Sequence, residues 1–276
     1  MDDLTTRINA LYDRTMFEDE GILGTGNHNL GYWGRGVENP DQAARRLYRK
    51  VFEMIPEDDR AAGKILDVAC GLGGCAEFLA SQIGSGNVTG INISEVQLDG
   101  CRKAVPGGTF LLMSATDLDF HDECFHHILS IEAAFHFDPR SRFFAEAFRL
   151  LRPGGWLVMS DILVDSTGHR GWVGEPAGII PASNFLEGDH GERIAAYVRL
   201  LADAGFQSVE AENATASCTD SFVRHMKRFA SIDGKVRAFV GRMESERNWT
   251  PYVLVRARKA CDDTPGSVHA GTGGSA

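Results

Sequence analysis

A glycine-rich turn follows a short apolar run near residue 64. The run 64–68 reads Lys-Ile-Leu-Asp-Val, the turn 69–74 reads Ala-Cys-Gly-Leu-Gly-Gly, and the apolar periodicity after it predicts a helix over 74–83. Glycine allows positive φ and close approach of a ligand to the backbone, and the free N–H groups at a helix N-terminus attract polar or anionic groups. The turn therefore predicts a nucleotide-cofactor site, with a tight turn that binds nothing as the alternative.

The residues after this turn bear on which cofactor it takes. A dinucleotide-binding fold places a third glycine in the turn and a carboxylate about 20 residues further on, where it binds the ribose hydroxyls. Here Ala76 stands at the third position, and the second apolar run ends at 89–94 in Thr-Gly-Ile-Asn-Ile-Ser, without a carboxylate. Asn92 can hydrogen-bond a ribose as a neutral group, so the pattern disfavours hydride-transfer chemistry.

A group of titratable residues between 121 and 127 has the residue types of a metal site. His121, Asp122, Glu123, His126 and His127 lie close in sequence, but the His-Glu-x-x-His zinc pattern needs an adjacent His and Glu on one helix. Asp122 intervenes here, and the segment leads into an apolar run that predicts a strand. We interpret the group as a structural loop and expect no metal ion.

Short apolar runs alternate with amphipathic stretches from residue 64 onward, which is typical of βα units that build a mostly parallel sheet. We predict seven strands, over 64–69, 87–92, 108–112, 125–131, 155–163, 207–213 and 250–258. We predict helices over 74–83, 94–104, 139–151 and 190–204, the last ended by Gly205. The expected fold class is α/β, and ligands of such sheets bind at the carboxyl edge of the parallel strands.

The remaining segments surround this core. Leu4, Ile8 and Leu11 repeat at helical spacing, and Asn39 with Pro40 predicts the start of a helix that runs to about residue 55. We expect an N-terminal helical lid over 1–60 and a core over 61–260 that carries substrate-cap insertions at 164–190 and 217–247, the second of them helical. The small, polar tail over 261–276 is expected to be disordered.

Composition limits the class of protein. The chain has 276 residues, 43% of them hydrophobic, and a formal net charge of -10, which disfavours binding to nucleic acid or to anionic membranes. No apolar run reaches the ~18 residues that span a bilayer, and Met1, Asp2 and Asp3 stand where a signal peptide carries basic residues. The six cysteines form no Cys-x-x-Cys pair. We expect a cytoplasmic protein with reduced thiols and leave a homodimer open.

Four passages resemble the class I S-adenosylmethionine-dependent methyltransferases, in particular the small-molecule branch with sugar O-methyltransferases and tocopherol-type and prenyl-diphosphate C-methyltransferases. They are the turn at 66–74, the passage 88–94 with Gln97, Ser-Ile-Glu-Ala-Ala-Phe-His at 130–136, and Leu-Leu-Arg-Pro-Gly-Gly-Trp at 150–156. A weaker fifth, Asn-His-Asn-Leu-Gly-Tyr-Trp at 27–33, looks like the His-x-Gly-Tyr-Trp lid motif of that branch. The resemblance covers roughly residues 10–165 and implies a Rossmann-like fold with S-adenosylmethionine as cofactor.

The resemblance also implies which residues hold the methionine and ribose parts of the cofactor. Gly71 and Gly73 would hold the carboxylate and the ammonium, and Asp67 would orient the loop. Asn92 and Gln97 would serve the ribose.

For the adenine and the sulfonium the resemblance implies a second group. Asp117 would accept from the adenine amino group while Thr116 or Leu118 packs on the ring; the alternative for Asp117 is a turn residue. Tyr12 and Trp33 would close over the sulfonium, or would only join the lid to the core. The full set of implied cofactor contacts is Tyr12, Trp33, Asp67, Ala69, Gly71, Gly73, Asn92, Ile93, Gln97, Thr116, Asp117, Leu118 and Glu132.

Methyl transfer to a hydroxyl needs a base near the methyl group. His136 follows the predicted fourth strand at the ligand-binding edge, and a neutral imidazole accepts a proton near neutral pH; the alternative is a satisfied buried histidine among phenylalanines. Asp161 leaves the predicted fifth strand at the same edge. In the sugar O-methyltransferase branch a His and an Asp at these two positions form the acid/base pair, so the resemblance implies catalytic roles for both.

The sequence thus predicts methyl transfer to a hydroxyl oxygen of a small, rather apolar natural product, such as a polyketide, a terpenoid or a glycosylated metabolite, with His136 as general base. One alternative is C-methylation of an electron-rich ring or a prenyl alkene, in which Glu132 or Asp161 takes the proton and a Mg ion accompanies a diphosphate acceptor. Another is a non-catalytic cofactor-binding protein of the same fold.

Overall fold

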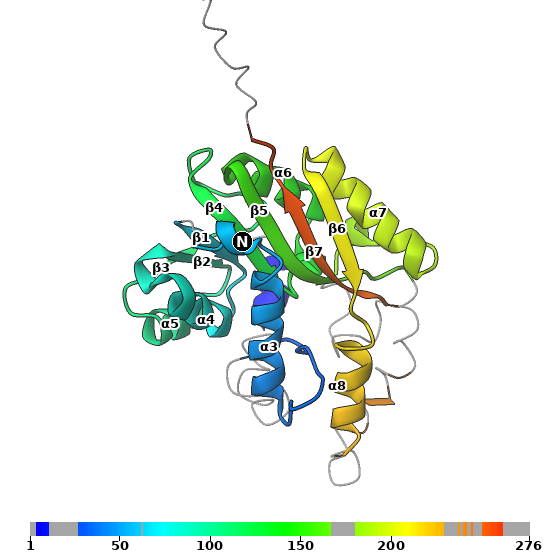
Figure 1. Ribbon diagram of the computed structural model, residues 1–276. Coiled ribbons are helices and arrows are strands. Elements are labelled where there is room, and N and C mark those ends of the chain that lie inside the picture. Colours follow the sequence, from blue (N-terminus) through cyan, green and yellow to red (C-terminus); the bar gives the residue numbers. More distant parts are fainter. Residues whose placement is uncertain are drawn as a thin grey trace, which may run out of the picture.

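The computed structural model describes residues 4–10, 27–61, 63–166, 180–228, 237, 240, 241, 244 and 250–261. Within these residues seven strands form one sheet in the order β3-β2-β1-β4-β5-β7-β6 (Figure 1). The strands are β1 Ile65–Val68, β2 Val88–Asn92, β3 Thr109–Leu112, β4 Phe125–Ile131, β5 Leu151–Ile162, β6 Gln207–Asn213 and β7 Tyr252–Arg258. Neighbours from β3 to β5 are parallel, and β7 runs antiparallel to β5 and β6. The α/β class and the mostly parallel sheet are confirmed.

The helices begin where the sequence supplies capping groups. Asn39 accepts a hydrogen bond from the Gln42 N–H ahead of Pro40, and Asp189 forms a capping box with Glu192. The helices are α3 Pro40–Phe52, α4 Gly74–Ile83, α5 Glu95–Ala104, α6 Arg140–Leu150, α7 His190–Asp203 and α8 Thr219–Met226, and two short 3-10 turns near the carboxyl edge are η3 Ala134–His136 and η5 Ala182–Asn184. Residues 4–10 are also helical.

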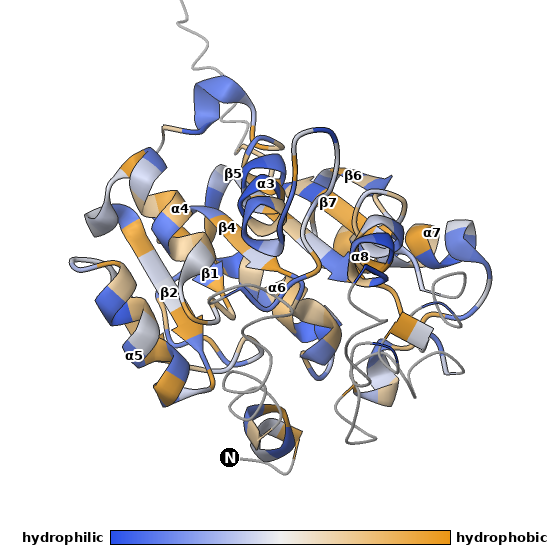
Figure 2. Cartoon of the chain, turned by 90° about the horizontal axis from the view of Figure 1, so that it is seen from below, coloured by the Kyte–Doolittle hydropathy of each residue, from blue (hydrophilic) through white to orange (hydrophobic). Residues whose placement is uncertain are grey.

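The strands β1, β2, β4, β5 and β7 are largely buried on both faces because alternate residues pack against different helices, whereas β3 and β6 are mostly exposed. Ile65 and Leu129 belong to the hydrophobic cluster with α3, α4, α5 and α8, whereas Leu66 and Ile128 belong to the cluster with α6 and α7. Figure 1 shows α3 in front of the sheet and α6 behind it, and Figure 2 shows strands with many hydrophobic residues between helices that mix hydrophobic and hydrophilic residues. This three-layer packing leaves the carboxyl ends of the parallel strands free to build a site.

Some boundaries differ from the predictions. β5 starts at Leu151 instead of 155 because Leu151 pairs with Phe125 ahead of a register shift and the Gly154 N–H donates to the Lys259 carbonyl. The helix α3 ends at Phe52, before the predicted 55. The tail was predicted over 261–276, and its residues 262–276 lie outside the described residues. Parts of the predicted insertions at 164–190 and 217–247 also lie outside them, namely 167–179 and most of 229–247.

The residues between 121 and 127 take structural contacts. The Lys64 N–H donates to His126 Nδ1 at 3.1 Å, and His127 Nε2 lies 2.9 Å from the Asp59 carbonyl oxygen. Within the described ranges no group of three His, Cys, Asp or Glu side chains is arranged to hold a metal ion. The six cysteines are free thiols. In the part of the chain that the structure describes, no helix has the length and apolar character needed to cross a membrane.

Candidate active site

The glycine turn after β1 opens onto a cavity at the carboxyl edge of the sheet. Ala69, Gly71 and Gly73 adopt φ values of 60°, 54° and 95°, which turn the chain from β1 into α4. A Cβ placed on Gly71 would meet no atom within 4 Å, and Gly71 lines the cavity. The backbone of the turn is therefore open to a ligand, as the sequence pattern predicts.

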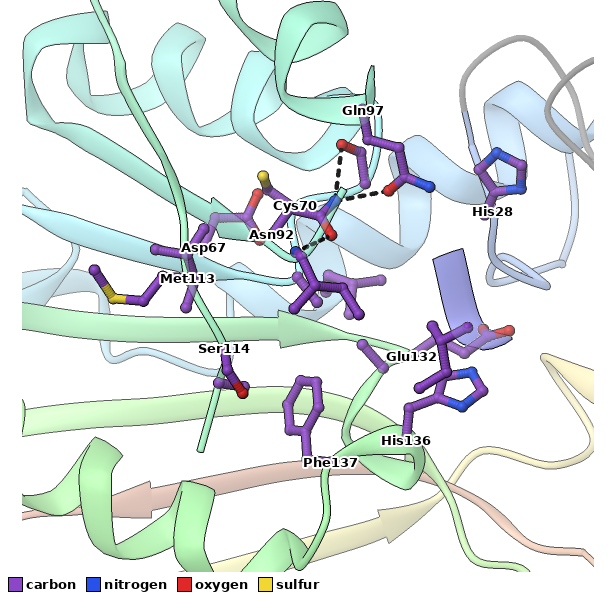
Figure 3. A pocket seen from close by; sticks show the side chains of 18 of the residues that line it. His28, Asp67, Cys70, Asn92, Gln97, Met113, Ser114, Glu132, His136 and Phe137 are labelled. Carbon is purple, nitrogen blue, oxygen red and sulfur yellow. Dashed lines mark hydrogen bonds between the residues drawn. The ribbon is translucent and has the colours of Figure 1, made fainter. Parts of the chain in front are cut away.

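The cavity contains about 1200 Å³ of empty space, including the part that is open to solvent. Its walls come from the N-terminal helix, the glycine turn, the ends of β2 and β4, the segment after β3, and η3 (Figure 3). The sequence-predicted site residues that line it are Asp67, Ala69, Gly71, Asn92, Ile93, Gln97, Thr116, Glu132 and His136.

Two buried oxygen atoms on the cavity wall have no hydrogen-bond partner among the described residues: Asp67 Oδ2 and Asn29 Oδ1. Burial raises the pKa of Asp67 to about 7, and a hydrogen bond with Cys75 opposes the shift. A buried acceptor without a donor costs about 1–3 kcal/mol of stability, and more if it is charged. Both oxygens can therefore gain stabilisation from a ligand that brings a donor, above all a cationic one.

The helix α3 holds Asn29 against the glycine turn. Asn29 Nδ2 donates to Tyr48 Oη at 2.9 Å, and Tyr48 Oη donates to Asn27 Oδ1 at 2.5 Å. A Cβ on Gly74 would lie 2.4 Å from Asn27 Oδ1 and 3.1 Å from Tyr48 Oη. Glycine at position 74 therefore lets residues 27–29 reach the turn, and the two segments meet only because the turn lacks a side chain there.

At the end of β2, Asn92 and Gln97 form a pair of neutral amides on one wall of the cavity (Figure 3). Asn92 Nδ2 donates to Gln97 Oε1 at 2.7 Å, and Asn92 Oδ1 accepts from the Ile93 N–H at 2.7 Å. Ser94 caps α5 by accepting from the Gln97 N–H. These contacts fix both amides at the position where a ribose would be bound in a sheet of this topology.

Glu132 ties the end of β4 to the segment before α3. It has a φ of 51°, both of its carboxylate oxygens accept from the Leu30 N–H at 3.2 and 3.0 Å, and Oε2 also accepts from Tyr252 Oη at 2.8 Å. Burial raises the pKa of Glu132 to about 8, while the hydrogen bonds oppose the shift. Glu132 lines the cavity, but its described contacts make it an anchor for residues 27–33.

His136 ends η3 and lines the same cavity as the glycine turn. Its backbone N–H donates to the Ala133 carbonyl at 3.0 Å, and its ring packs on Phe135 with a centroid distance of 4.1 Å. Figure 3 shows the ring on a different wall of the cavity from Asn92 and Gln97. The imidazole is thus one of the titratable side chains that line the cavity, together with His28, Asp67, Glu132 and Asp138.

Asp161 lies behind this turn and does not line the cavity. Strand alternation points its side chain to the face of α6 and α7, where its Oδ2 lies 3.1 Å from Arg140 Nε and accepts from Tyr197 Oη at 2.8 Å. Its Oδ1 accepts from the Phe135 N–H at 3.1 Å. Burial raises the pKa of Asp161, and the Arg140 guanidinium opposes the shift. The structure therefore does not bring Asp161 and His136 together as a pair facing the cavity; Asp161 supports the turn that carries His136.

Four other residues predicted to contact the cofactor do not line the cavity or lie outside the described residues. Trp33 packs against Phe222 and His225 at ring-centroid distances of 6.3 and 4.4 Å, and Tyr12 lies outside the described residues. A Cβ on Gly73 would lie 3.0 Å from Cys101 Cα, so this glycine faces α5. Leu118 is buried in the cluster with α6 and α7.

Asp117 is the remaining departure from the predicted contacts. Its side chain is 88% exposed and lies 3.9 Å from Arg142. Its backbone pairs with Ser114 in an isolated bridge, which turns the side chain outward. The neighbouring residues 113–116 line the cavity instead. The alternative interpretation of Asp117 as a turn residue agrees with this geometry.

Sequence reasoning missed several residues of the site. Asn29 and His28 line the cavity within the passage that resembles a lid motif, so that passage was the available signal. Tyr48 lies on the buried face of α3, where its spacing indicates only a core residue. Asn184, which contacts the backbone around His136, carries no signal in the sequence, because 44 residues or more separate it from the groups that its side chain bonds to.

A methyltransferase domain family matches residues 66–159. The erythromycin 3''-O-methyltransferase of Saccharopolyspora erythraea is 31% identical over 203 residues, which are 67% of this chain and 63% of that protein. The methyltransferase GfsG of Streptomyces halstedii is 34% identical over 162 residues, 56% of this chain and 55% of that protein. The chain thus spans less than two thirds of the length of these curated relatives.

Among solved structures, the crystal structure of the [4+2]-cyclase SpnF is similar in fold, with a TM-score of 0.69, 21% sequence identity, and coverage of 92% of this chain and 95% of that chain. At this identity the likeness supports the Rossmann-like fold alone. The matched domain, the named relatives, the glycine turn and the cavity agree that residues 66–159 form a methyltransferase domain of the S-adenosylmethionine-dependent kind.

Proposed function

We propose that this protein transfers the methyl group of S-adenosylmethionine to a hydroxyl oxygen of a small natural-product metabolite, with His136 as the general base. The observation that carries the proposal is that His136 and the glycine turn line one cavity. A base and a cofactor site in one cavity satisfy the requirement that nucleophile, methyl group and base be aligned.

The residues of the cavity suit S-adenosylmethionine, whose sulfonium supplies an activated methyl group when it is bound. Asp67 Oδ2 and Asn29 Oδ1 are two unpartnered acceptors within the described residues, and they would receive the ammonium group of the methionine part. Asn92 and Gln97 would bind the ribose, and Gly71 leaves the turn open to the methionine carboxylate. Thr116 and its neighbours would lie along the adenine.

The proposed proton transfer uses the position of His136. A neutral imidazole at the cavity wall accepts the hydroxyl proton of the acceptor as the oxygen becomes nucleophilic, and afterwards releases this proton to solvent. Asp161, held by Arg140 and Tyr197 behind η3, positions the turn and takes no proton from the acceptor. We propose this division of roles in place of an acid/base pair at the cavity.

The acceptor we propose is a neutral, glycosylated or polyketide-type metabolite. Among the described lining residues, Asp67, Glu132 and Asp138 are acidic and none is a lysine or arginine, which favours a neutral acceptor over a diphosphate. The erythromycin relative bears the name of a 3''-O-methyltransferase, which supports a sugar hydroxyl of a macrolide as the first acceptor to test. The helix 4–10 lines the cavity and supports the assignment of the N-terminal segment as a lid.

The test of the proposal begins with binding and then measures transfer. Radiolabelled S-adenosylmethionine should bind the wild type, and Gly71→Arg should abolish binding because the cavity would be filled. Transfer to a macrolide with a free 3''-hydroxyl, and to a panel of glycosylated polyketides, should fall in His136→Ala by about 10²–10⁴-fold, with cofactor affinity unchanged. Equal losses in turnover and affinity would contradict the role of base, and absence of binding by the wild type would contradict the whole proposal.

A second candidate is C-methylation, which the carboxylate of Glu132 at the cavity wall would favour. In that case Glu132→Gln should abolish transfer to an electron-rich ring or alkene, while His136→Ala should retain it. The Leu30 N–H and Tyr252 Oη already occupy the two oxygens of Glu132, and for this reason we place C-methylation second.

A further inference from the structure

One side-chain amide bonds to the carbonyl groups of the two residues that flank His136 in the sequence. Asn184 Nδ2 donates to the carbonyl oxygen of Phe135 at 3.1 Å and to that of Phe137 at 2.6 Å. We propose that Asn184 is a positioning residue for His136, and that it fixes the backbone on both sides of the base. This inference rests on the proposed function, in which His136 takes the acceptor proton.

The Asn184 side chain has one orientation in this network. It is 2% exposed, and its Oδ1 accepts from the Arg140 N–H at 2.8 Å. Both amide hydrogens and the carbonyl oxygen are therefore engaged. Exchanging the oxygen and nitrogen positions would set an oxygen against two carbonyl oxygens and an NH₂ group against an N–H donor, so the hydrogen-bond network itself determines the orientation.

Asn184 belongs to a segment remote in sequence from the turn it holds. It ends η5, where its own N–H donates to the Pro181 carbonyl at 2.9 Å. The neighbouring Ser183 Oγ donates to Asp138 Oδ1 at 2.6 Å, and Asp138 lines the cavity. The segment 181–184 is thus bonded to the loop that runs from η3 into α6 at several points.

A second set of contacts holds the other side of η3, so the turn does not depend on Asn184 for its existence. Asp161 Oδ1 accepts from the Phe135 N–H, and Arg140 Nε lies 3.4 Å from the Ala134 carbonyl oxygen. These groups fix the start of η3 but make no described contact with the carbonyl of Phe137. Asn184 is the side chain, within the described residues, that bonds to the chain both before and after His136.

The consequence is a defined position of the imidazole relative to the glycine turn. The two carbonyl anchors restrict the backbone dihedral angles of His136 and Phe137 together, and the direction of the His136 ring depends on them. A displacement of about 1 Å in a reacting group can cost about 10²-fold in rate. Loss of the Asn184 amide should therefore displace the base while the cofactor-binding residues, which lie on other elements, keep their geometry.

The experiment uses protein labelled with ¹³C in the histidine rings, and it follows the His136 NMR signal with and without S-adenosylhomocysteine. Asn184→Ala removes every contact of the side chain. Asn184→Asp keeps an oxygen for the Arg140 N–H and removes both donors, so it also serves if the alanine variant does not fold. Ser183→Ala is the matched control, because it changes the same turn η5 without touching the two carbonyl bonds.

We expect the His136 ring signal to shift and broaden in both Asn184 variants and to stay at the wild-type position in Ser183→Ala. Affinity for S-adenosylhomocysteine should change by no more than about twofold, a size typical of substitutions away from the ligand. A His136 signal that coincides with the wild type in folded Asn184 variants would overturn the proposal. Failure of both variants to fold would also overturn it, in favour of a structural role alone.

These outcomes are separate from a failure of the proposed function. The His136 signal can be compared among variants without any ligand, so the position of the ring is tested even if S-adenosylhomocysteine does not bind. Absence of binding by the wild type would contradict the proposed function, whereas normal binding with an unmoved His136 signal in the Asn184 variants would contradict only the role of Asn184.

Discussion

Among single residues, the buried carboxylates determine how stability depends on pH. Glu132 has a pKa raised by burial from 4.5 to about 8, and Asp67 has one raised from 3.8 to about 7. The folded state therefore binds protons more tightly than the unfolded state, and the free energy of unfolding should fall as pH rises from about 4 to about 8. These groups contribute their full stability below the unfolded pKa and lose it as pH passes the folded pKa.

The first prediction is that Glu132→Gln flattens this fall. Glutamine keeps the shape and one oxygen for the Leu30 N–H but does not titrate, so the unfolding free energy should depend less steeply on pH. Urea unfolding at several pH values between about 5 and about 8 measures the slope. Glu77→Gln, in an exposed ion pair with Arg45, is the control and should leave the slope as in the wild type. An unchanged slope in Glu132→Gln would show that Glu132 is ionised throughout this range.

The second prediction concerns the two unpartnered oxygens. If Asp67 and Asn29 receive the ammonium of the cofactor, Asp67→Asn should weaken S-adenosylhomocysteine binding by roughly 10–100-fold, the equivalent of a charged hydrogen bond. An analogue that lacks the amino group should bind the wild type and Asp67→Asn about equally. Calorimetric titration of both ligands into both proteins gives the coupling free energy between the amino group of the ligand and the Asp67 carboxylate. Equal weakening for the two ligands would place the ammonium elsewhere.

At the scale of single residues the sequence predicted types of chemistry better than positions. Gly71 and His136 were predicted to lie at the site because each follows the carboxyl end of a predicted strand. The carboxyl ends of parallel strands meet at one edge of the sheet. Asp161 was predicted for the same edge, but strand alternation turns it to the opposite side of η3, where Arg140 neutralises it. Asp117 sits in a turn whose direction no local pattern encodes.

Among the elements, α3 links the lid segment to the glycine turn through Tyr48. The third prediction is that Tyr48→Phe removes this link, because Asn27 and Asn29 lose their shared hydroxyl partner while remaining buried. Each buried polar group left unpaired costs about 1–3 kcal/mol, so urea unfolding should show a loss of this size, and binding of S-adenosylhomocysteine should weaken. Tyr32→Phe, at a half-buried tyrosine under Lys50, is the control. Equal effects of the two substitutions would contradict the link.

Strand and helix positions were predicted closely because buried strands read as apolar runs and helix starts carry capping residues. The buried strand β4 has the predicted bounds 125–131, and α3 begins at the predicted Asn39-Pro40 pair. The start of β5 was missed because Pro153 and two glycines look like a loop, while the pairing of Leu151 with Phe125 extends the strand through them. Long-range pairing of this kind has no local signature.

For the whole molecule, the order of strands brings distant segments around one cavity. β2 lies on one side of β1 and β4 lies on its other side, so the strand order reverses at β1. The crevice opens at this reversal, as in other open α/β sheets. Residues from 4 to 138 line it, and the C-terminal antiparallel strand β7 reaches it through the bond from Tyr252 to Glu132. Apolar patterns predicted the strands but not their order, which depends on how the helices pack on both faces.

The fourth prediction follows from this arrangement. A ligand that bridges the N-terminal helix, the glycine turn and η3 binds the folded state alone, so at 100 times its dissociation constant S-adenosylhomocysteine should stabilise the protein by about 2.7 kcal/mol. For a chain of this size that corresponds to a rise in Tm of roughly 5 °C. Thermal scans measure the rise, and amide hydrogen exchange should show added protection in 4–10 and 27–33. Gly71→Arg should show neither effect, and a rise in Tm without protection of these two segments would mean that the lid does not close on the cofactor.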